Sequence, residues 1–355
     1  MALITSGCAP FRTDGREWLL SGDAKGCVVA WDLAERRLHS VHRTAHRAAV
    51  TTLICLPGQP VLLTGSADNS LKMWVFDGAE AGAPRLLRSR SGHSAAPTRV
   101  RYHGEAQGKL LLSGGLDQAF RAMNAHADRQ AREMSQKHVL KRRRTATGDE
   151  QEEKLPPLLD MAICEAKEGR WANLLTCHVG DHYAYAWEHH NKMISKFTYC
   201  ASDKLPIMSV AISSCGNFGF VGSSGGCIDR YNLQSGKHRG AYSMGDGAKF
   251  GVRAKFGEGT PAHDGAVHGL AVDRVNTVLI SSGYDGLLKF WDFNSRALRQ
   301  TVEINSPVTM LRLQPSRFAP RDTAFPRTSA VILPKTDAFA CGAAAGCWRW
   351  SRTTS

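Results

Sequence analysis

Several patterns that identify metal proteins or nucleotide-binding enzymes are missing from this sequence. It contains no P-loop and no H-E-x-x-H pattern, so neither a phosphate-binding loop nor a zinc-protease helix is predicted. None of its ten cysteines forms a C-x-x-C pair, so a zinc site is not expected either. We therefore expect no catalytic residue, no metal, no cofactor and no small-molecule substrate.

Long apolar runs are also missing. No apolar stretch approaches the length needed to cross a bilayer, and the N-terminus lacks a basic segment followed by an apolar one. We therefore expect no membrane association and no secretory leader. The cysteines are scattered, and some lie in apolar stretches, as Cys55 does beside Leu56. Free cysteine acts there as a small hydrophobic residue, which favours a reducing compartment.

The chain is rich in basic residues and in glycine. Its 45 Lys and Arg exceed its 32 Asp and Glu, which gives a formal net charge of +13. Such an excess favours contact with a polyanion, most often a nucleic acid, and the alternative is a solvated surface with one basic loop. The 34 glycines suit a fold with many tight turns.

The informative signal is an internal repeat of about 45 residues. Residues 63–74, 112–123 and 280–291 align, and in each an Asp in a small-residue turn precedes a large closing residue by six positions. A His lies 28, 30 and 28 residues before that closing residue. The three sets are His46, Asp68 and Trp74; His93, Asp117 and Met123; and His263, Asp285 and Trp291.

Three weaker copies follow the same frame. They close at Trp31, at Trp187 with Asp181 in place, and at Tyr231, where Gly225 takes the Asp position. Each copy reads as four strands joined by turns, which is one propeller blade. The sequence therefore predicts an all-β fold, a WD-repeat β-propeller with at least six blade signatures.

The repeated His and Asp have two interpretations. They resemble catalytic groups, but they recur from copy to copy, whereas a catalytic site occurs once. We expect them instead to form a buried hydrogen-bond network with the closing residue and a strand hydroxyl such as Thr64 or Ser66. The predicted network residues are His46, Asp68, Trp74, His93, Asp117, Asp181, Trp187, His263, Asp285, Trp291 and Trp31.

The repeats divide the chain into four parts. Blades are predicted for residues 1–123 and 158–313, separated by an insertion at 124–157 and followed by an irregular tail at 314–355. The insertion is basic and then acidic, which indicates a nuclear-import signal or an RNA contact. The alternative is a solvated loop with no partner. The candidate contact residues are Lys137, Lys141, Arg142, Arg143 and Arg144.

One stretch carries a more specific resemblance. Residues 209–218, continuing through 222–226 to 231–240, resemble the WD-repeat subunit of the UTP-B module of the small-subunit processome. Residues 43–46, 66–72 and 92–94 support this, and the resemblance covers about residues 3–313. Members of this family carry two tandem propellers and a helical C-terminal domain. The resemblance thus implies blades from tandem propellers truncated at both ends.

The same resemblance implies a function. Members are nucleolar, assemble on pre-ribosomal RNA with the U-three snoRNP and are needed for small-subunit rRNA processing. We therefore expect a non-catalytic scaffold in the nucleus and nucleolus, with other UTP-B subunits, pre-rRNA and the U-three snoRNP as partners. The alternative is a WD-repeat adaptor in another nuclear complex, such as a ubiquitin-ligase substrate receptor or a chromatin reader.

Overall fold

The fold is described from a computed structural model of the chain. The described residues are 4–13, 16–32, 35–56, 59–76, 84–103, 110–125, 131–137, 139, 154–244, 260–304, 308–314, 329–334, 340–343 and 346–349. Among them, no helix has the length and apolar character required to span a membrane.

The described residues form seven four-stranded sheets, numbered here in chain order, and each pairs its strands antiparallel in sequence order. Sheet 1 is β1 (Ile4–Thr13), β2 (Arg16–Asp23), β3 (Val28–Asp32) and β4 (Arg37–His42). Sheet 2 is β5 (Val50–Cys55), β6 (Val61–Ser66), β7 (Ser70–Val75) and β8 (Arg85–Ser91). Sheet 3 is β9 (Pro97–His103), β10 (Leu110–Gly115), β11 (Phe120–Asn124) and β12 (Arg132–Glu133). These three sheets belong to one compact unit.

A second compact unit holds the other four sheets, apart from the first residue of β13. Sheet 4 is β13 (Leu158–Ile163), β14 (Leu174–His178), β15 (Tyr183–Glu188) and β16 (Met193–Cys200). Sheet 5 is β17 (Ile207–Ile212), β18 (Phe218–Ser223), β19 (Ile228–Asn232) and β20 (His238–Tyr242). Sheet 6 is β21 (Val267–Val272), β22 (Val278–Gly283), β23 (Leu287–Asp292) and β24 (Leu298–Glu303). Sheet 7 is β25 (Val308–Gln314), β26 (Ser329–Pro334), β27 (Ala340–Ala343) and β28 (Gly346–Arg349).

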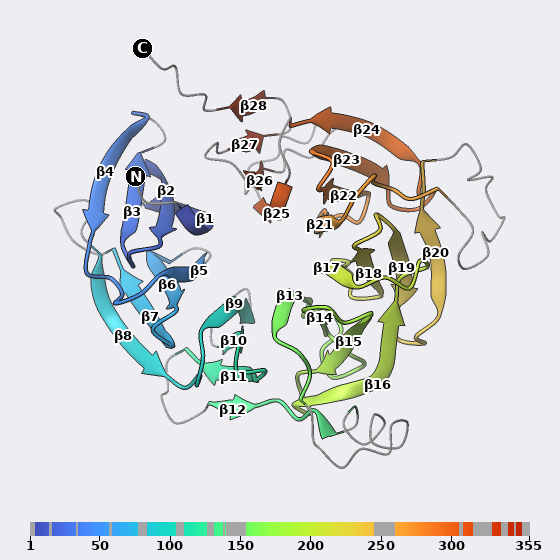
Figure 1. Ribbon diagram of the computed structural model, residues 1–355, viewed down its shortest axis with the longest axis horizontal. Helices are drawn as coiled ribbons and strands as arrows, with labels where there is room; N and C mark the ends of the chain where they lie inside the picture. Colours follow the sequence, from blue (N-terminus) through green and yellow to red (C-terminus); the bar gives the residue numbers. More distant parts are fainter. Residues whose placement is uncertain are drawn as a thin grey trace. The chain divides into compact units, whose positions relative to one another are not determined.

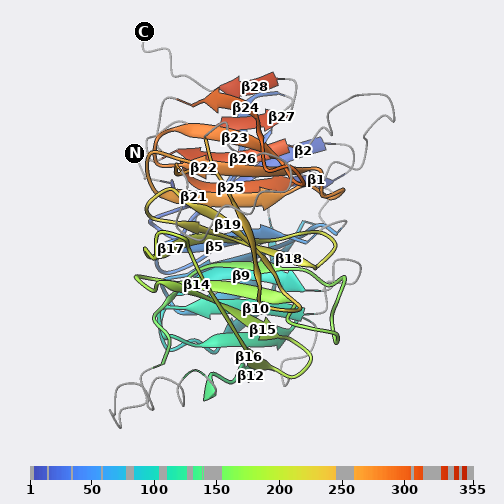
Figure 2. The same cartoon turned by 90° about the vertical axis from the view of Figure 1, so that its right-hand side faces the viewer.

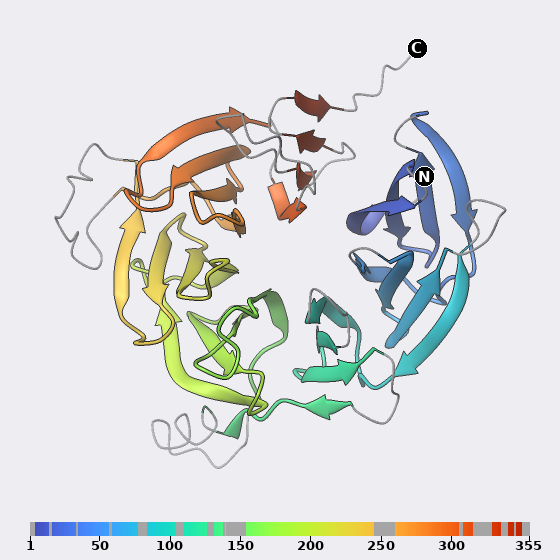
Figure 3. The same cartoon turned by 180° about the vertical axis from the view of Figure 1, so that it is seen from behind.

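Burial changes systematically across a sheet. Every residue of β6 and of β22 is buried, whereas the fourth strands β8 and β24 are mostly exposed. A strand covered on both faces reads as a continuous apolar run, which explains Val61, Leu62 and Leu63. Figures 1 and 3 show β4 and β8 following one another along the outer edge of the first unit. Figure 2 shows sheets 4, 5 and 6 of the second unit stacked in chain order.

The apolar core lies between consecutive sheets. Leu62 packs in a cluster with Trp18 and Leu20 of sheet 1, and its neighbour Leu63 packs with Val100 of sheet 3. Adjacent residues divide in this way because successive side chains of a strand point to opposite faces. Further clusters join sheet 4 to 5, sheet 5 to 6 and sheet 6 to 7. Within each compact unit, the apolar faces of a sheet are thus buried against the neighbouring sheets.

A backbone contact also joins consecutive sheets. The turn between the second and third strands contains a residue with positive φ, such as Gly26 (83°), Gly226 (90°) or Gly286 (75°). The carbonyl of Gly26 accepts from His46 N–H at 3.0 Å, and that of Gly226 accepts from His263 N–H at 3.1 Å. A Cβ added at Gly226 would overlap the His263 carbonyl oxygen. Glycine is therefore required there by conformation and by space.

Two predicted boundaries need revision. The segment predicted as an insertion, 124–157, contains β12, which pairs with β11 and completes sheet 3. The tail predicted to be irregular, 314–355, contains β26 to β28, which pair in order with β25. These strands carry no Asp turn of the repeat, but strand pairing uses backbone groups and does not require one. The basic residues Lys141, Arg142, Arg143 and Arg144 lie outside the described residues.

The turn contact generates a stability prediction. Gly226→Ala should lower the free energy of unfolding by about 3 kcal/mol or more, because it adds steric overlap to a strained φ. Gly180 is the matched control, since its φ is also positive (71°) but its Cβ position has no neighbour within 4 Å. Gly180→Ala should therefore cost only the conformational strain, about 1–2 kcal/mol. Urea unfolding of both variants measures the difference, and equal losses would contradict the contact.

Candidate functional site

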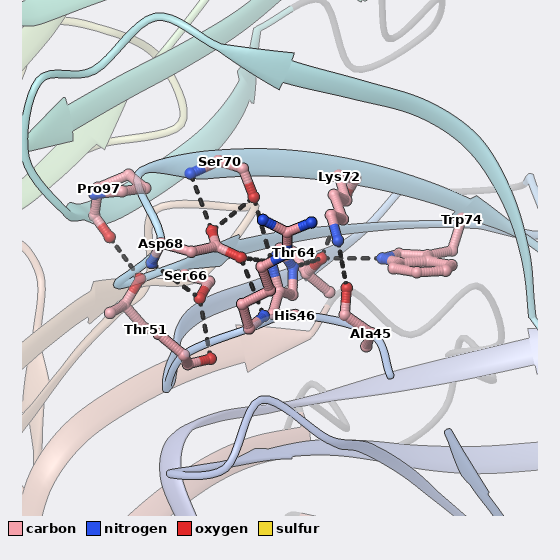
Figure 4. Close-up of polar contacts among 12 residues, drawn as sticks. Ala45, His46, Thr51, Thr64, Ser66, Asp68, Ser70, Lys72, Trp74 and Pro97 are labelled. Atoms are coloured by element: carbon pink, nitrogen blue, oxygen red, sulfur yellow. Dashed lines mark hydrogen bonds and ion pairs between the residues drawn. The ribbon is translucent and has the colours of Figure 1, made fainter. Parts of the chain in front are cut away.

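In sheet 2 the predicted residues meet around one buried hydroxyl (Figure 4). The indole N–H of Trp74 donates to Thr64 Oγ1 at 2.9 Å, and Thr64 Oγ1 lies 2.6 Å from His46 Nε2. On the other side of the imidazole, His46 Nδ1 lies 3.1 Å from Asp68 Oδ2. Thr64 itself has no exposed surface. The network therefore links β6, β7, the turn between them and the loop before β5 through groups that are largely hidden from water.

The directions of these hydrogen bonds follow from the number of protons available. Trp74 only donates, so Thr64 Oγ1 accepts from it and has its own proton left for His46 Nε2. His46 then carries its proton on Nδ1 and donates to the Asp68 carboxylate. Every group is satisfied with a neutral imidazole, as a buried network requires.

Sheets 6 and 3 repeat this arrangement. In sheet 6, Trp291 Nε1 donates to Ser281 Oγ at 2.8 Å, Ser281 Oγ lies 2.7 Å from His263 Nε2, and His263 Nδ1 lies 2.9 Å from Asp285. In sheet 3 the corresponding contacts are His93 Nε2 to Ser113 Oγ at 2.7 Å and His93 Nδ1 to Asp117 at 3.0 Å. Met123 closes that sheet without a side-chain donor, so the hydroxyl there serves the His alone.

Sheets 4 and 1 retain the Trp–hydroxyl contact with different partners. In sheet 4, Trp187 Nε1 donates to Thr176 Oγ1 at 2.7 Å, and His178 Nε2 lies 3.1 Å from the same oxygen. The Tyr185 hydroxyl donates to Asp181 at 2.9 Å. The His thus comes from the second strand of the sheet and not from the preceding loop. In sheet 1, Trp31 Nε1 donates to Ser21 Oγ at 3.0 Å.

Sheet 5 replaces the His by a carboxylate. Asp203 occupies the position four residues before the first strand, and Ser223 Oγ donates to it at 2.5 Å. Asp229 has no exposed surface and accepts from Ser202 N–H, from the Ser202 hydroxyl and from His238 Nε2 at 2.7, 2.5 and 2.7 Å. Burial first, and then these two carboxylates, raise the pKa of the Cys227 thiol to about 12.

A cation takes the corresponding place in sheets 2 and 6, half-buried in sheet 2 and buried in sheet 6. Lys72 and Lys289 stand two residues before the closing Trp, as Asp229 stands two before Tyr231. Lys289 is only 2% exposed, and its Nζ donates to the Ala262 carbonyl at 2.6 Å. Lys72 Nζ donates in the same way to Ala45 at 2.6 Å. Each cation therefore ties the third strand to the loop that carries the network His.

The environment shifts the pKa of the network groups. Burial lowers the pKa of His46, His93 and His263, and hydrogen bonding and charge from the paired Asp only partly oppose this. Burial by itself would raise the pKa of Asp68, but hydrogen bonds, chiefly from the Ser70 side chain and backbone, bring it well below its usual range. The geometry thus pairs a neutral imidazole with an ionised carboxylate.

This arrangement is structural in every sheet where it occurs. The His and Asp side chains are occupied by contacts that hold strands and turns, and the same set recurs along the chain. Residues 222–226 read G-x-S-x-G, a pattern of hydrolase nucleophile elbows that our sequence reasoning overlooked. They lie at the end of β18 and in the turn to β19, whereas an elbow joins a strand to a helix.

Some network residues were not predicted. Ser21 and Ser113 each stand ten residues before their closing residue, as the predicted Thr64 does before Trp74, so a spacing signal was available. His178 departs from the repeat. Asp203 stands 28 residues before Tyr231, which is the spacing from His46 to Trp74, and Tyr185 and Asp229 stand two residues before their closing residues, as Lys72 and Lys289 do. At these positions the spacing is kept and only the residue type differs. Of the predicted basic contacts, Lys137 is described and exposed.

Removal of one closing Trp tests the network. Trp74→Ala should lower the free energy of unfolding by about 3–5 kcal/mol, because it empties a buried aromatic site. Trp74→Phe keeps most of the ring but leaves Thr64 without its donor, and it should cost about 1–3 kcal/mol. Chemical unfolding measures both variants. A loss below about 1 kcal/mol for Trp74→Ala would contradict the assignment.

The lowered His pKa values predict acid sensitivity. In the unfolded chain these imidazoles take up protons at a higher pH than in the folded one, so stability is complete above pH ~6.5 and falls below it. Each His should contribute at most about 1.4 kcal/mol per pH unit. Unfolding at pH 7 and pH 5 measures this slope. His263→Gln should flatten it, while replacement of exposed His190 by Gln should not; an unchanged slope in His263→Gln would contradict the prediction.

Comparison with known proteins identifies the family to which these sheets belong. The family described as the WDR36/Utp21 second beta-propeller domain matches residues 98–318, and the description of the first beta-propeller matches residues 5–77. The gap between the two matches, residues 78–97, contains β8 and lies within the first compact unit. Matches to both propellers agree with the expectation of tandem propellers, and the WD-repeat β-propeller fold is confirmed.

Curated relatives agree with this match. The chain is 36% identical over 299 residues to a U3 small nucleolar RNA-associated protein 21 homolog of Schizosaccharomyces pombe, covering 84% of the chain and 31% of that protein. It is 34% identical over 314 residues to U3 small nucleolar RNA-associated protein 21 of Saccharomyces cerevisiae, covering 85% and 31%. Identity to human WD repeat-containing protein 36 is 33% over 309 residues, covering 85% and 33%. The chain therefore spans about a third of these relatives' length, and it belongs to the WDR36/Utp21 family.

Proposed function

We propose that this chain is part of a non-catalytic scaffold in small-subunit ribosome biogenesis that supports pre-rRNA processing. The observation that carries the proposal is the family match over residues 98–318. Two of its relatives are named for association with U3 small nucleolar RNA. A net charge of +13 supports a role next to RNA, because attraction to phosphates draws basic proteins to nucleic acid.

The geometry supports a scaffold and not an enzyme. The acids and imidazoles that recur in the repeats are engaged in contacts that hold the sheets. A rigid set of sheets carries loops at both strand ends, and such loops bind partners without rearrangement of the core. The protein would thus act by holding partners in place.

The proposal includes location and partners. A U3-associated scaffold works in the nucleolus, and the basic run at 141–144 would serve as an import signal or an RNA contact. The proposed partners are other UTP-B subunits, pre-rRNA and the U-three snoRNP. Attraction to RNA by this route weakens as salt rises.

Depletion of the full-length protein tests the proposal. Small-subunit rRNA should fall and its precursors accumulate, while large-subunit rRNA is spared, because the proposed scaffold serves only one subunit. Northern blots of precursor and mature rRNA measure this, and rescue by the wild-type gene is the control. Unchanged precursors would overturn the proposal and favour an adaptor in another nuclear complex, such as a ubiquitin-ligase receptor or a chromatin reader.

A further inference from the structure

The outer strand of sheet 4 carries an unusually large bulge. In sheets 1, 2, 5 and 6 the outer strand has one extra residue beside the closing residue. In sheet 4, Tyr185 pairs with Thr198 and Trp187 pairs with Ile194, so Ser195, Lys196 and Phe197 stand opposite Ala186 alone. Bulges redirect side chains and are frequent beside functional sites. This one turns Lys196 outward and Phe197 toward the next sheet.

A groove of about 380 Å³ lies beside the bulge. We call it the β16 groove; it is lined by residues 170–172, 188, 193–197 and 233–234, all within the second compact unit. Its volume falls in the range of small-molecule and nucleoside-sized sites, about 300–1,000 Å³. Buried Ala172, Ile194 and Leu233 supply apolar surface.

Two half-exposed aromatic rings border the groove, and both are held in place. The Trp171 indole N–H donates to the Gly216 carbonyl at 2.8 Å, which fixes the ring. Phe197 packs against Gly236, where an added Cβ would come within 2.5 Å of the ring. Both rings also pack against the apolar core between sheets 4 and 5. A ring that is held in place and partly exposed can act as a platform for stacking a planar group.

A lysine ammonium group lies close to each of the two rings. Lys196 Nζ lies 5.1 Å from the Phe197 ring centroid, and Lys167 Nζ lies 5.6 Å from that of Trp171. Arg170 at the groove wall is exposed. The lining carboxylate, Glu188, accepts from Asn191 Nδ2 at 2.6 Å, and three cations lie in or beside the groove against this one anion. The groove thus combines stacking surface with positive charge.

We propose that the β16 groove binds unpaired nucleotides of single-stranded RNA. A base would stack on Phe197 or Trp171, and the adjoining phosphates would meet Arg170 and Lys196. Single-stranded nucleic acids are held by this combination of aromatic platforms and basic groups. The inference rests on the proposed function, which places the protein beside RNA.

An acidic peptide is the competing occupant, and the observations favour RNA over it. A peptide segment in a groove needs backbone partners or several apolar pockets in register. The β16 groove instead offers two aromatic rings, each with its own cation. That pairing suits a chain in which planar bases alternate with phosphates.

The test uses the full-length protein and a fluorescent single-stranded RNA of mixed sequence, with duplex RNA of equal length for comparison. The double variant Arg170→Glu with Lys196→Glu changes only exposed side chains. The matched control reverses two exposed cations elsewhere in the second unit, Lys204→Glu with Arg274→Glu. The groove variant should weaken single-strand binding about tenfold or more, and the control less than about threefold, at fixed salt. Trp171→Leu should weaken single-strand binding but not duplex binding, because only unpaired bases stack.

Three results would overturn the proposal: wild-type protein that does not bind the RNA, equal losses in groove and control variants, or a groove variant that loses a protein partner but keeps RNA binding. The last would assign the groove to a peptide. Wild-type melting temperatures in all variants exclude unfolding as the cause. Unchanged RNA binding in the groove variant would overturn only the assignment of the groove as an RNA site. Normal rRNA after depletion would overturn the proposed function.

Discussion

The fold depends on one buried hydroxyl in each sheet that carries the hydrogen-bond network of His, hydroxyl and closing residue. The second strand of such a sheet is covered on both faces, so any polar group on that strand must find a hydrogen-bond partner inside the protein. Thr64 and Ser281 have no exposed surface, and each is satisfied by an indole donor and an imidazole acceptor. Without the hydroxyl, two buried nitrogen atoms would lose their partner at once. The closing Trp and the loop His are thus positioned by the same atom.

Variation among the sheets follows from this constraint. In sheet 3 the closing residue is Met123, which has no indole N–H, so the hydroxyl contacts only the His. In sheet 4 the His lies on the second strand and not in the preceding loop. Sheet 5 changes the sign of the buried charge, with Asp229 where sheets 2 and 6 have Lys72 and Lys289. In sheets 2, 5 and 6 this charged residue ties the third strand to the loop before the first strand. The buried polar groups thus keep hydrogen-bond partners, although the residue types differ from sheet to sheet.

Repeat spacing was sufficient to predict the fold and much of the network. Asp68, Trp74 and His46 recur at fixed intervals, and fixed intervals reflect a repeated backbone. Asp203 and Asp229 were missed because they keep the spacing of the repeat but change the residue type, from His to Asp at one position and from Lys to Asp at the other. The strands of 314–355 were missed because they form without the Asp turn that marked the others. The β16 groove was missed because it arises where the bulge of β16 has one more extra residue than the bulges of the other outer strands. Such an insertion changes the strand register but leaves no mark in the amino-acid composition.

The turn contact between consecutive sheets has a direction. Gly226 of sheet 5 holds the backbone of His263 in sheet 6, while its own N–H bonds to Ser223 within sheet 5. Gly26 holds His46 and Gly286 holds Ile304 in the same sense. Opening of either sheet breaks this contact, so it couples the two neighbours by the same free energy in both directions. Local opening of one sheet should therefore loosen the sheet on each side of it, and amide hydrogen exchange would record this as protection shared between consecutive sheets.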